Sequence, residues 1–293
     1  MRLYRFIYVP IALCFWSSLS AQIIQGTTID AKTNKALSYV SIGILHTNIG
    51  TVSAVDGKFK LSISNTNIST DTLIISDIGY SPIIIPLSYY IKYKNSNDSN
   101  FELEPKVELL NECIIGSGKT KRLISGNTVK NGVICVGFSS EELGTEIGTV
   151  IKYHKKKRGK VENVNFNIAD NKYDSLLFRV NIYNFSSGKI GKSLLKSPIY
   201  LKIKTQKGIV SVDLSDSNIY VSKDFLLSLE WIKNYSPDDA AIDEQLPYGI
   251  DKLHFCAGFL NSNSYIRPGS ESDWSKSPVG IGFWATIQYK KHL

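Results

Sequence analysis

The sequence contains few of the residue types that mark helical, membrane or redox proteins. Its 293 residues include one methionine, four cysteines, four histidines and four tryptophans. After the first 21 residues no apolar run reaches about 18 residues, so we expect no transmembrane helix in that part of the chain. What is abundant is tyrosine, with 16 residues, together with Ile, Val, Ser and Thr. These residues favour strands, and the chain length favours two domains, so we predict an all-β protein of two domains.

The chain also lacks a general excess of positive charge. Its net charge is +8, but Arg2 and Arg5 near the N-terminus and five basic residues in HKKKRGK (154–160) supply seven of these charges, which leaves +1 for the rest. Nucleic acid is therefore not an expected partner. The basic run itself is interpreted as a solvated loop, and contact with an anionic cell-surface polymer is the alternative.

The N-terminus has the layout of a secretory signal. Two arginines precede an apolar stretch from Phe6 to Trp16, and small residues end at Ala21. We therefore predict a signal peptide over residues 1–21 and an exported protein that is periplasmic, associated with the outer membrane or secreted. A lipid anchor at Cys14 is the alternative, which the bulky Leu13 disfavours.

Three cysteines remain after that segment, at positions 113, 135 and 256. Their neighbours are apolar, which favours buried free thiols over a reactive site. An oxidising compartment would permit one disulfide, and the sequence does not determine which pair would form it.

Residues 22–105 carry the signature of a small β-sandwich. Turn signals recur every eight to twelve residues, and KFKLSI (58–63) alternates apolar and polar side chains. We expect Phe59, Leu61 and Ile63 to face a core. Asp56-Gly57 directly before this segment predicts a hairpin turn, because glycine adopts a positive φ without steric cost. The segment is explained as a turn and a strand, without any chemical role.

The same residues resemble the carboxypeptidase-like regulatory domain of secreted and outer-membrane proteins of Bacteroidetes. GTTIDAKTNKALSYVSIGILHTNIGTVSAVDGKFKLSI and DTLIISDIGY are similar to its pattern at Gly26, Asp30, Leu37, Val40, Ser41, Gly50, Thr51, Ser53, Asp56, Gly57, Phe59, Asp71, Leu73, Ser76, Gly79 and Tyr80. Ala36 and Thr28 depart from it. The resemblance implies a transthyretin-like, seven-stranded β-sandwich that is not itself catalytic.

A linker and a second β domain are expected beyond this module. Residues 106–131 are rich in Gly, Lys, Ser and Asn and are interpreted as a linker. Residues 132–293 contain nine candidate strands, which predicts a second β-sandwich or a jelly-roll-like domain. SPDDAAIDEQLPYG (236–249) is expected to be an exposed acidic loop.

No sequence pattern for catalysis or metal binding is complete. GSGKT (116–120) has Cys113 where a phosphate-binding loop needs its first glycine. None of the four histidines belongs to a His-x-x-Glu pair, and His254 with Cys256 lacks further ligands. No nucleophile elbow is present, and carboxylates such as Asp213, Asp224, Glu230, Asp251 and Asp273 are not evidence of sugar hydrolysis by themselves. We expect no catalytic residue, no metal and no cofactor.

The candidate ligand-binding residues are aromatic. In VGIGFWATIQYKK (279–291) alternation places Phe283, Ala285 and Ile287 on one face and Trp284 on the other. Trp284 could stack on a sugar together with Tyr265, Arg267 and Trp274 from the preceding loop. The alternative is that these side chains pack in the core.

Together these features predict an exported, non-catalytic binding or assembly module of the bacterial cell envelope. Its expected partner is a surface glycan, as in a glycan-binding accessory protein, or another envelope protein. The competing hypothesis is a carbohydrate-active enzyme with its site in the C-terminal β-sandwich. Two converging carboxylates would favour the enzyme, and an exposed aromatic row would favour the binding module.

Overall fold

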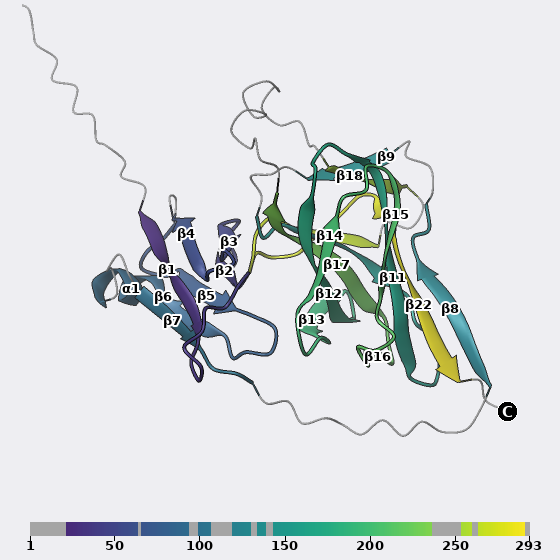
Figure 1. Ribbon diagram of the computed structural model, residues 1–293, viewed down its shortest axis with the longest axis horizontal. Coiled ribbons are helices and arrows are strands. Elements are labelled where there is room, and N and C mark those ends of the chain that lie inside the picture. The colour runs from purple at the N-terminus through teal and green to yellow at the C-terminus, as the bar shows by residue number, and fades with distance from the viewer. Residues whose placement is uncertain are drawn as a thin grey trace, which may run out of the picture.

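The computed structural model describes residues 22–63, 66–93, 99–106, 119–129, 134–138, 143–235, 253–259 and 263–290. The strands form two β domains, one after the other along the chain (Figure 1). The predicted fold class, all-β with a β-sandwich followed by a second β domain, is confirmed.

The first domain has seven strands among its described residues, in two sheets. One sheet has the order β4 (Lys58–Ser62), β1 (Ile23–Asp30), β7 (Ser99–Leu103). The other has the order β3 (Gly50–Val52), β2 (Ser41–Ile44), β5 (Thr72–Ser76), β6 (Ile83–Pro86). A short helix that was not predicted, α1 (Leu87–Tyr93), follows β6. One apolar cluster with residues from both sheets makes this a β-sandwich; it includes Ile24, Ile42, Phe59, Leu73 and Phe101.

Strand β4 has the predicted alternation, but the turn before it is not a hairpin. Phe59 and Leu61 are buried and Lys58 and Lys60 are exposed. Gly57 has a φ of +78°, and its N–H donates to the Ala54 carbonyl at 3.0 Å. The turn connects β3 to β4, and these strands belong to different sheets. The Asp-Gly signal therefore marks a crossing between the layers of the sandwich.

The second domain is built from a seven-stranded and an eight-stranded sheet. The seven-stranded sheet has the order β13 (Lys189–Ser193), β12 (Leu176–Ser186), β17 (Phe225–Asn234), β10 (Glu146–Ile151), β19 (Ser264–Arg267), β20 (Ser275–Lys276), and β14 (Ile199–Ile203) also pairs with β12. The eight-stranded sheet has the order β21 (Gly280–Ile281), β18 (Leu253–Gly258), β11 (Gly159–Asn171), β22 (Phe283–Lys290), β8 (Thr120–Gly126). In this sheet β15 (Gly208–Asp213) and β16 (Tyr220–Val221) also pair with β11, and β9 (Ile134–Phe138) pairs with β18.

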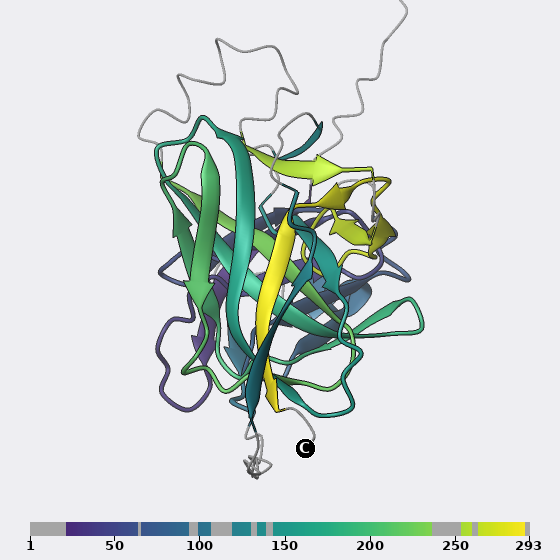
Figure 2. The same ribbon diagram turned by 90° about the vertical axis from the view of Figure 1, so that its right-hand side faces the viewer.

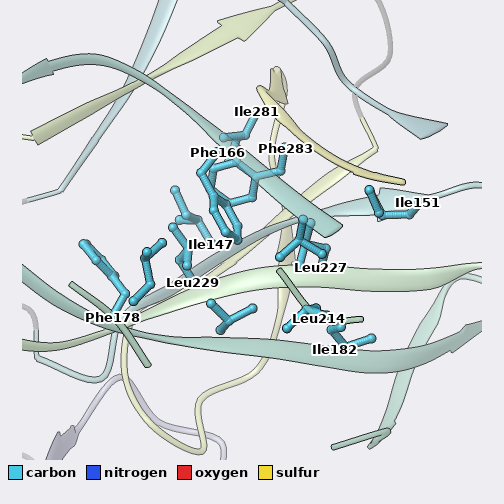
Figure 3. Close-up of a cluster of buried hydrophobic side chains, with 14 of the residues drawn as sticks. Ile147, Ile151, Phe166, Phe178, Ile182, Leu214, Leu227, Leu229, Ile281 and Phe283 are labelled. Carbon is cyan, nitrogen blue, oxygen red and sulfur yellow. The ribbon is translucent and has the colours of Figure 1, made fainter. Parts of the chain in front are cut away.

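The core of this domain lies between its two sheets (Figure 3). Phe178, Ile182 and Leu229 enter it from the seven-stranded sheet, and Phe166 and Phe283 enter it from the eight-stranded sheet. The rings of Phe166 and Phe283 meet edge to face with centroids 4.8 Å apart, a favourable aromatic geometry. Two sheets that share one core form a sandwich.

The second domain begins earlier than the sequence indicated. The predicted linker over 106–131 includes β8, which pairs in register with β22 so that Ile124 lies opposite Thr286. Figure 2 shows β8 beside the yellow strand β22. The polar residues of this strand suggested a linker because β8 lies at the end of the sheet order, where many of its side chains face solvent.

Some predicted segments lie outside the described residues, namely the signal peptide (1–21), Cys113 and the acidic loop (236–249). The basic run at 154–160 is described. It connects β10 to β11 with mostly exposed side chains, as predicted, and Lys155 and Arg158 lie over the rings of Tyr289 and Tyr220 at 5.4 and 5.2 Å. Within the described residues, no helix has the length and apolar character needed to span a membrane.

Candidate binding pocket between the two domains

A row of four charged side chains crosses the seven-stranded sheet on its non-core face. Arg179 on β12 lies opposite Glu230 on β17, Glu230 lies opposite Glu146 on β10, and Glu146 lies opposite Arg267 on β19. Like charges at directly opposed positions repel, so the two glutamates require compensation. The row supplies it, because an arginine flanks the glutamate pair on each side.

The hydrogen-bond acceptors of Glu230 are occupied. Its Oε2 atom accepts from Arg179 Nε at 2.9 Å and Nη2 at 2.7 Å, and from Asn181 Nδ2 at 3.1 Å. Its Oε1 atom accepts from Ser41 Oγ at 3.0 Å and Ser270 Oγ at 3.3 Å. The side chain is 1% exposed, so these bonds replace its hydration.

Glu146 is equally well satisfied. Arg267 Nε donates to its Oε2 atom at 2.8 Å, and Arg267 Nη2 forms an ion pair with the same atom at 2.5 Å. Tyr183 Oη donates to Oε2 at 3.3 Å. Asn181 Nδ2 donates to its Oε1 atom at 3.0 Å, and Ser228 Oγ donates to the same atom. Asn181 thus bridges the two carboxylates, which places them side by side.

The first domain docks directly on this row. Arg179 Nη1 donates to the Tyr39 carbonyl at 2.9 Å and to Asp77 Oδ1 at 3.3 Å, and Nη2 donates to Ser41 Oγ. The backbones of the two domains also approach each other closely next to this contact. A Cβ atom at Gly50 would lie only 2.6 Å from the Ser270 nitrogen. The arginine therefore belongs to the contact between the domains as much as to its own sheet.

Burial changes the titration of the acids at this contact. It raises the pKa of Asp77 to about 6, although the Arg179 guanidinium acts in the opposite direction. Burial alone would also raise the pKa of Glu230, but the guanidiniums of Arg179 and Arg267 outweigh it and hold that pKa below its ordinary value. Near neutral pH Glu230 is therefore an anion locked in ion pairs.

A pocket of about 810 Å³ opens beside the row, between the domains. Its walls come from β5 and the segment after it, from β12 and β13, and from the loop after β19. Charged and aromatic side chains in its lining are Asp77, Tyr80, Lys106, Arg179, Tyr183, Lys192, Lys196, Glu230, Arg267, Glu271 and Trp274. A cleft of this size accommodates a small oligosaccharide or a ligand of similar size.

Two of the four predicted ligand-binding residues line this pocket. The Arg267 guanidinium lies over the Trp274 ring, 5.1 Å from its centroid, and the Tyr183 ring meets Trp274 edge on at 6.1 Å. Trp274 is half-buried. Tyr265 projects from the same face of β19 as Arg267, but it packs against Phe185 at 5.7 Å and is not part of the lining.

The predicted grouping of Trp284 with these residues is wrong. Trp284 lies on β22 in the eight-stranded sheet, opposite Asn165 of β11 and Gly126 of β8. Its neighbours Phe283 and Ala285 are fully buried, as the alternation predicted, so Trp284 projects away from the core. The two sheets with their core therefore separate Trp284 from Trp274.

The pocket also contains residues that sequence reasoning did not select, among them Asp77, Arg179 and Tyr183. A signal for two of them was present in SLLFRVNIYNF: Phe178, Val180 and Ile182 face the core, and the polar residues between them alternate onto one face. In the sequence Glu230 is one of several carboxylates, with no pattern that distinguishes it. Its pairing with Glu146 depends on strand order, which the sequence does not reveal.

The cysteines and histidines form no metal site in the described part of the chain, where no group of three or more His, Cys, Asp or Glu could hold an ion. Cys135 and Cys256 lie opposite one another on β9 and β18, and both are reduced. Cys256 is buried, as expected, but Cys135 is exposed, because β9 lies at the end of the sheet and leaves its thiol uncovered.

Comparison with known proteins agrees with the fold of the first domain. Residues 24–115 match the family model described as the CarboxypepD_reg-like domain. A search of curated proteins finds no match.

Two solved structures are similar over 85% of this chain, each with a TM-score of 0.36 and 9% sequence identity. One contains the cysteine protease and lectin-like domains of Cwp84, a surface layer associated protein of Clostridium difficile, and the other is the clostridial cysteine protease Cwp84 after propeptide cleavage. The chain covers 58% and 65% of them, less than two thirds of either.

Proposed function

We propose that this protein is an exported, non-catalytic binding module of the bacterial cell envelope, and that its ligand is a glycan held in the pocket between the domains. The observation that carries the proposal is the pocket itself, of about 810 Å³, which the two domains build jointly around a half-buried tryptophan. A glycan-binding accessory protein is the specific form of this role.

The chemistry of the lining supports a sugar ligand. Sugars present apolar faces that stack on aromatic rings and hydroxyls that need hydrogen-bond partners. Trp274 supplies a ring whose orientation is fixed by Arg267 and Tyr183. Polar groups of Ser76 and Ser193 are also in the lining.

The contacts of Glu146 and Glu230 argue against these two residues as the acid of a glycosidase, and they leave Asp77, whose pKa is raised to about 6, as the carboxyl group that the competing enzyme hypothesis requires. A glycosidase uses one carboxyl group as a general acid, and this group needs a raised pKa. The pKa of Glu230 is instead lowered by Arg179 and Arg267. Glu146 accepts hydrogen bonds from Arg267, Tyr183, Asn181 and Ser228. Glu230 therefore lacks the raised pKa of a general acid, and the acceptor atoms of Glu146 are occupied by partners within the protein.

The proposed location rests on the N-terminal segment and on the regulatory domain. Residues 1–21 have the layout of a secretory signal. Residues 24–115 match the CarboxypepD_reg-like model, and the sequence pattern resembles the version found in exported proteins of Bacteroidetes. Another envelope protein remains the alternative partner.

Tryptophan substitution tests the proposal with a matched control. We expect the purified protein to show a thermal shift with at least one class of oligosaccharide in a panel, because a ligand at about 100 times its Kd adds roughly 2.7 kcal/mol. Trp274→Ala should weaken that binding about tenfold or more in calorimetry, and Trp284→Ala on the far sheet should not. Loss of binding in the Trp284 variant alone, or no shift with any sugar, would refute the proposal.

A hydrolysis assay with the same purified protein distinguishes a binding module from an enzyme. Incubation with the bound oligosaccharide should release no new reducing ends. If reducing ends appear and vanish in the Asp77→Asn variant, the carbohydrate-active enzyme is the correct interpretation.

A further inference from the structure

We infer that Cys135 and Cys256 are a site for a disulfide that fastens the strand β9 to the rest of the second domain. The two residues lie directly opposite one another on the antiparallel strands β9 and β18. Directly opposed residues project to the same face of a sheet, so both thiols lie on one side of it. Strand register thus selects one pair among the three cysteines that follow the first 21 residues.

The backbone hydrogen bonds of Cys256 show what kind of pair this is. Opposed residues of antiparallel strands alternate between pairs that exchange backbone hydrogen bonds and pairs that do not. The Cys256 carbonyl accepts from the Gly282 N–H at 2.7 Å. Gly282 directly follows β21, and β21 lies on the edge of β18 opposite to β9, because both strands pair with Ala257. Cys256 therefore turns its backbone away from Cys135, and the two residues form a pair without mutual hydrogen bonds.

Pairs of this kind have the spacing that a disulfide needs. Their Cα atoms lie about 4.5 Å apart, against about 5.5 Å in the hydrogen-bonded kind, and their side chains are closer. A disulfide joins Cα atoms that are about 4.4–6.8 Å apart. Burial and the neighbouring Cys135 thiol raise the pKa of Cys256, which agrees with two sulfur atoms that lie near each other. The bond can therefore form without a movement of the strands.

The difference in exposure between the two thiols sets the order of the reaction. Cys135 is exposed, whereas Cys256 is 2% exposed. The oxidant is a small disulfide such as oxidised glutathione. The Cys135 thiolate attacks one sulfur of this disulfide and releases the other half as a thiolate. The Cys256 thiolate then attacks Sγ of Cys135 and releases the second half. The two protons of the protein thiols pass to the released thiolates, so two thiols are oxidised and one disulfide is reduced.

The bond would secure a strand that lies at the end of its sheet. Among the described strands, β9 pairs only with β18. A disulfide between them encloses the chain from β10 to β17, and the restriction of so long a loop in the unfolded state favours the folded one. The pair lies in the eight-stranded sheet, while the pocket is built on the seven-stranded one. The inference therefore goes beyond the proposed glycan binding and does not depend on it.

Peptide mapping of the purified protein tests the pairing. The protein is reduced with dithiothreitol, freed of reductant, incubated with excess oxidised glutathione, alkylated and digested. We expect two linked peptides, one with Cys135 and one with Cys256, whose combined mass is lower by two hydrogen atoms. The Cys113→Ala variant should give the same product. A link to Cys113 in the wild type, or Cys135 that stays joined to glutathione, would contradict the assignment.

Thermal unfolding shows whether the bond fits the folded protein. The oxidised wild type should unfold at a temperature roughly 5–15 °C above that of the reduced wild type, the range expected for a disulfide that closes a long loop. Cys256→Ala is the matched control, because it keeps Cys135 but cannot form the bond. Its two forms should unfold at nearly the same temperature. An oxidised wild type that unfolds at an equal or lower temperature than the reduced one would overturn the inference.

Discussion

At the scale of single residues, the contact between the domains depends on titratable groups removed from water. Asp77 is the clearest case, because its side chain is 6% exposed and 3.3 Å from Arg179. Such a group can be neutral under mildly acidic conditions in the folded protein while it is charged in the unfolded chain.

Asp77 should make the protein less stable as the pH rises. Its folded pKa of about 6 lies above the unfolded value of 3.8, so the folded state binds the proton more tightly. The stability from this group is present below pH 4 and is lost as the pH rises to about 6, with an amplitude of at most about 3 kcal/mol. Asp77→Asn should remove that component.

Urea denaturation at pH 4.5, 6 and 8 measures this effect as the difference between wild type and variant, which cancels the contributions of other acids. Asp174→Asn serves as control, since Asp174 is an exposed aspartate outside the contact between the domains. An unchanged pH dependence in Asp77→Asn would contradict the assignment.

At the scale of elements, strand pairing turns four separate charges into one neutral row. The row requires β12, β17, β10 and β19 in register, and a shift of one residue would turn every charge toward the core. The buried ion pairs therefore disfavour other strand registers. Their net contribution to the stability of the folded protein is small compared with the destabilisation that follows when one partner of a pair is removed.

Breaking the row on β17 should be costly. Glu230→Gln keeps the shape of the side chain but removes the anion between Arg179 and Arg267, and the loss of a buried partner typically costs about 3–5 kcal/mol. Chemical denaturation measures the change. Glu162→Gln, which breaks the ion pair with the exposed Arg122, should have a much smaller effect. Equal effects of the two variants would show that the buried row does not stabilise the sheet.

At the scale of the whole molecule, the two domains are joined by polar contacts and close backbone approach, with a small apolar contribution from Val52, Leu177 and Ile232. Glycine makes this approach possible, because a side chain at Gly43 would collide with the Ser270 carbonyl. The pocket exists only while the domains keep this arrangement.

Gly43→Val should therefore separate the domains without unfolding either of them. We expect a larger radius of gyration in small-angle X-ray scattering, two unfolding transitions in calorimetry where the wild type has one, and loss of ligand binding. Gly191→Ala is the control for scattering and calorimetry, because a Cβ at that position meets Asn184 at an ordinary distance of 3.4 Å. It is not a control for ligand binding, since Gly191 lines the pocket. A single transition and unchanged scattering in Gly43→Val would contradict the proposed role of this contact.

The sequence predicted the local features of the fold, namely which residues of a strand face the core. Alternation in KFKLSI and in VGIGFWATIQYKK predicted which side chains face a core, because successive side chains of a strand point to opposite faces. The first domain could also be predicted, since its turn and strand pattern is specific. The linker prediction failed at β8, a polar strand whose pairing with β22 depends on residues more than 150 positions away.

The site was decided by tertiary structure alone. Trp274 and Arg267, which the sequence selected, line the pocket, but the sequence also grouped them with Trp284, because strand order and sheet membership are long-range properties that no local pattern encodes. Glu146, Arg179 and Glu230 are unremarkable polar residues within their own strands. They become one buried row only when three strands pair in register and a second domain excludes water from them.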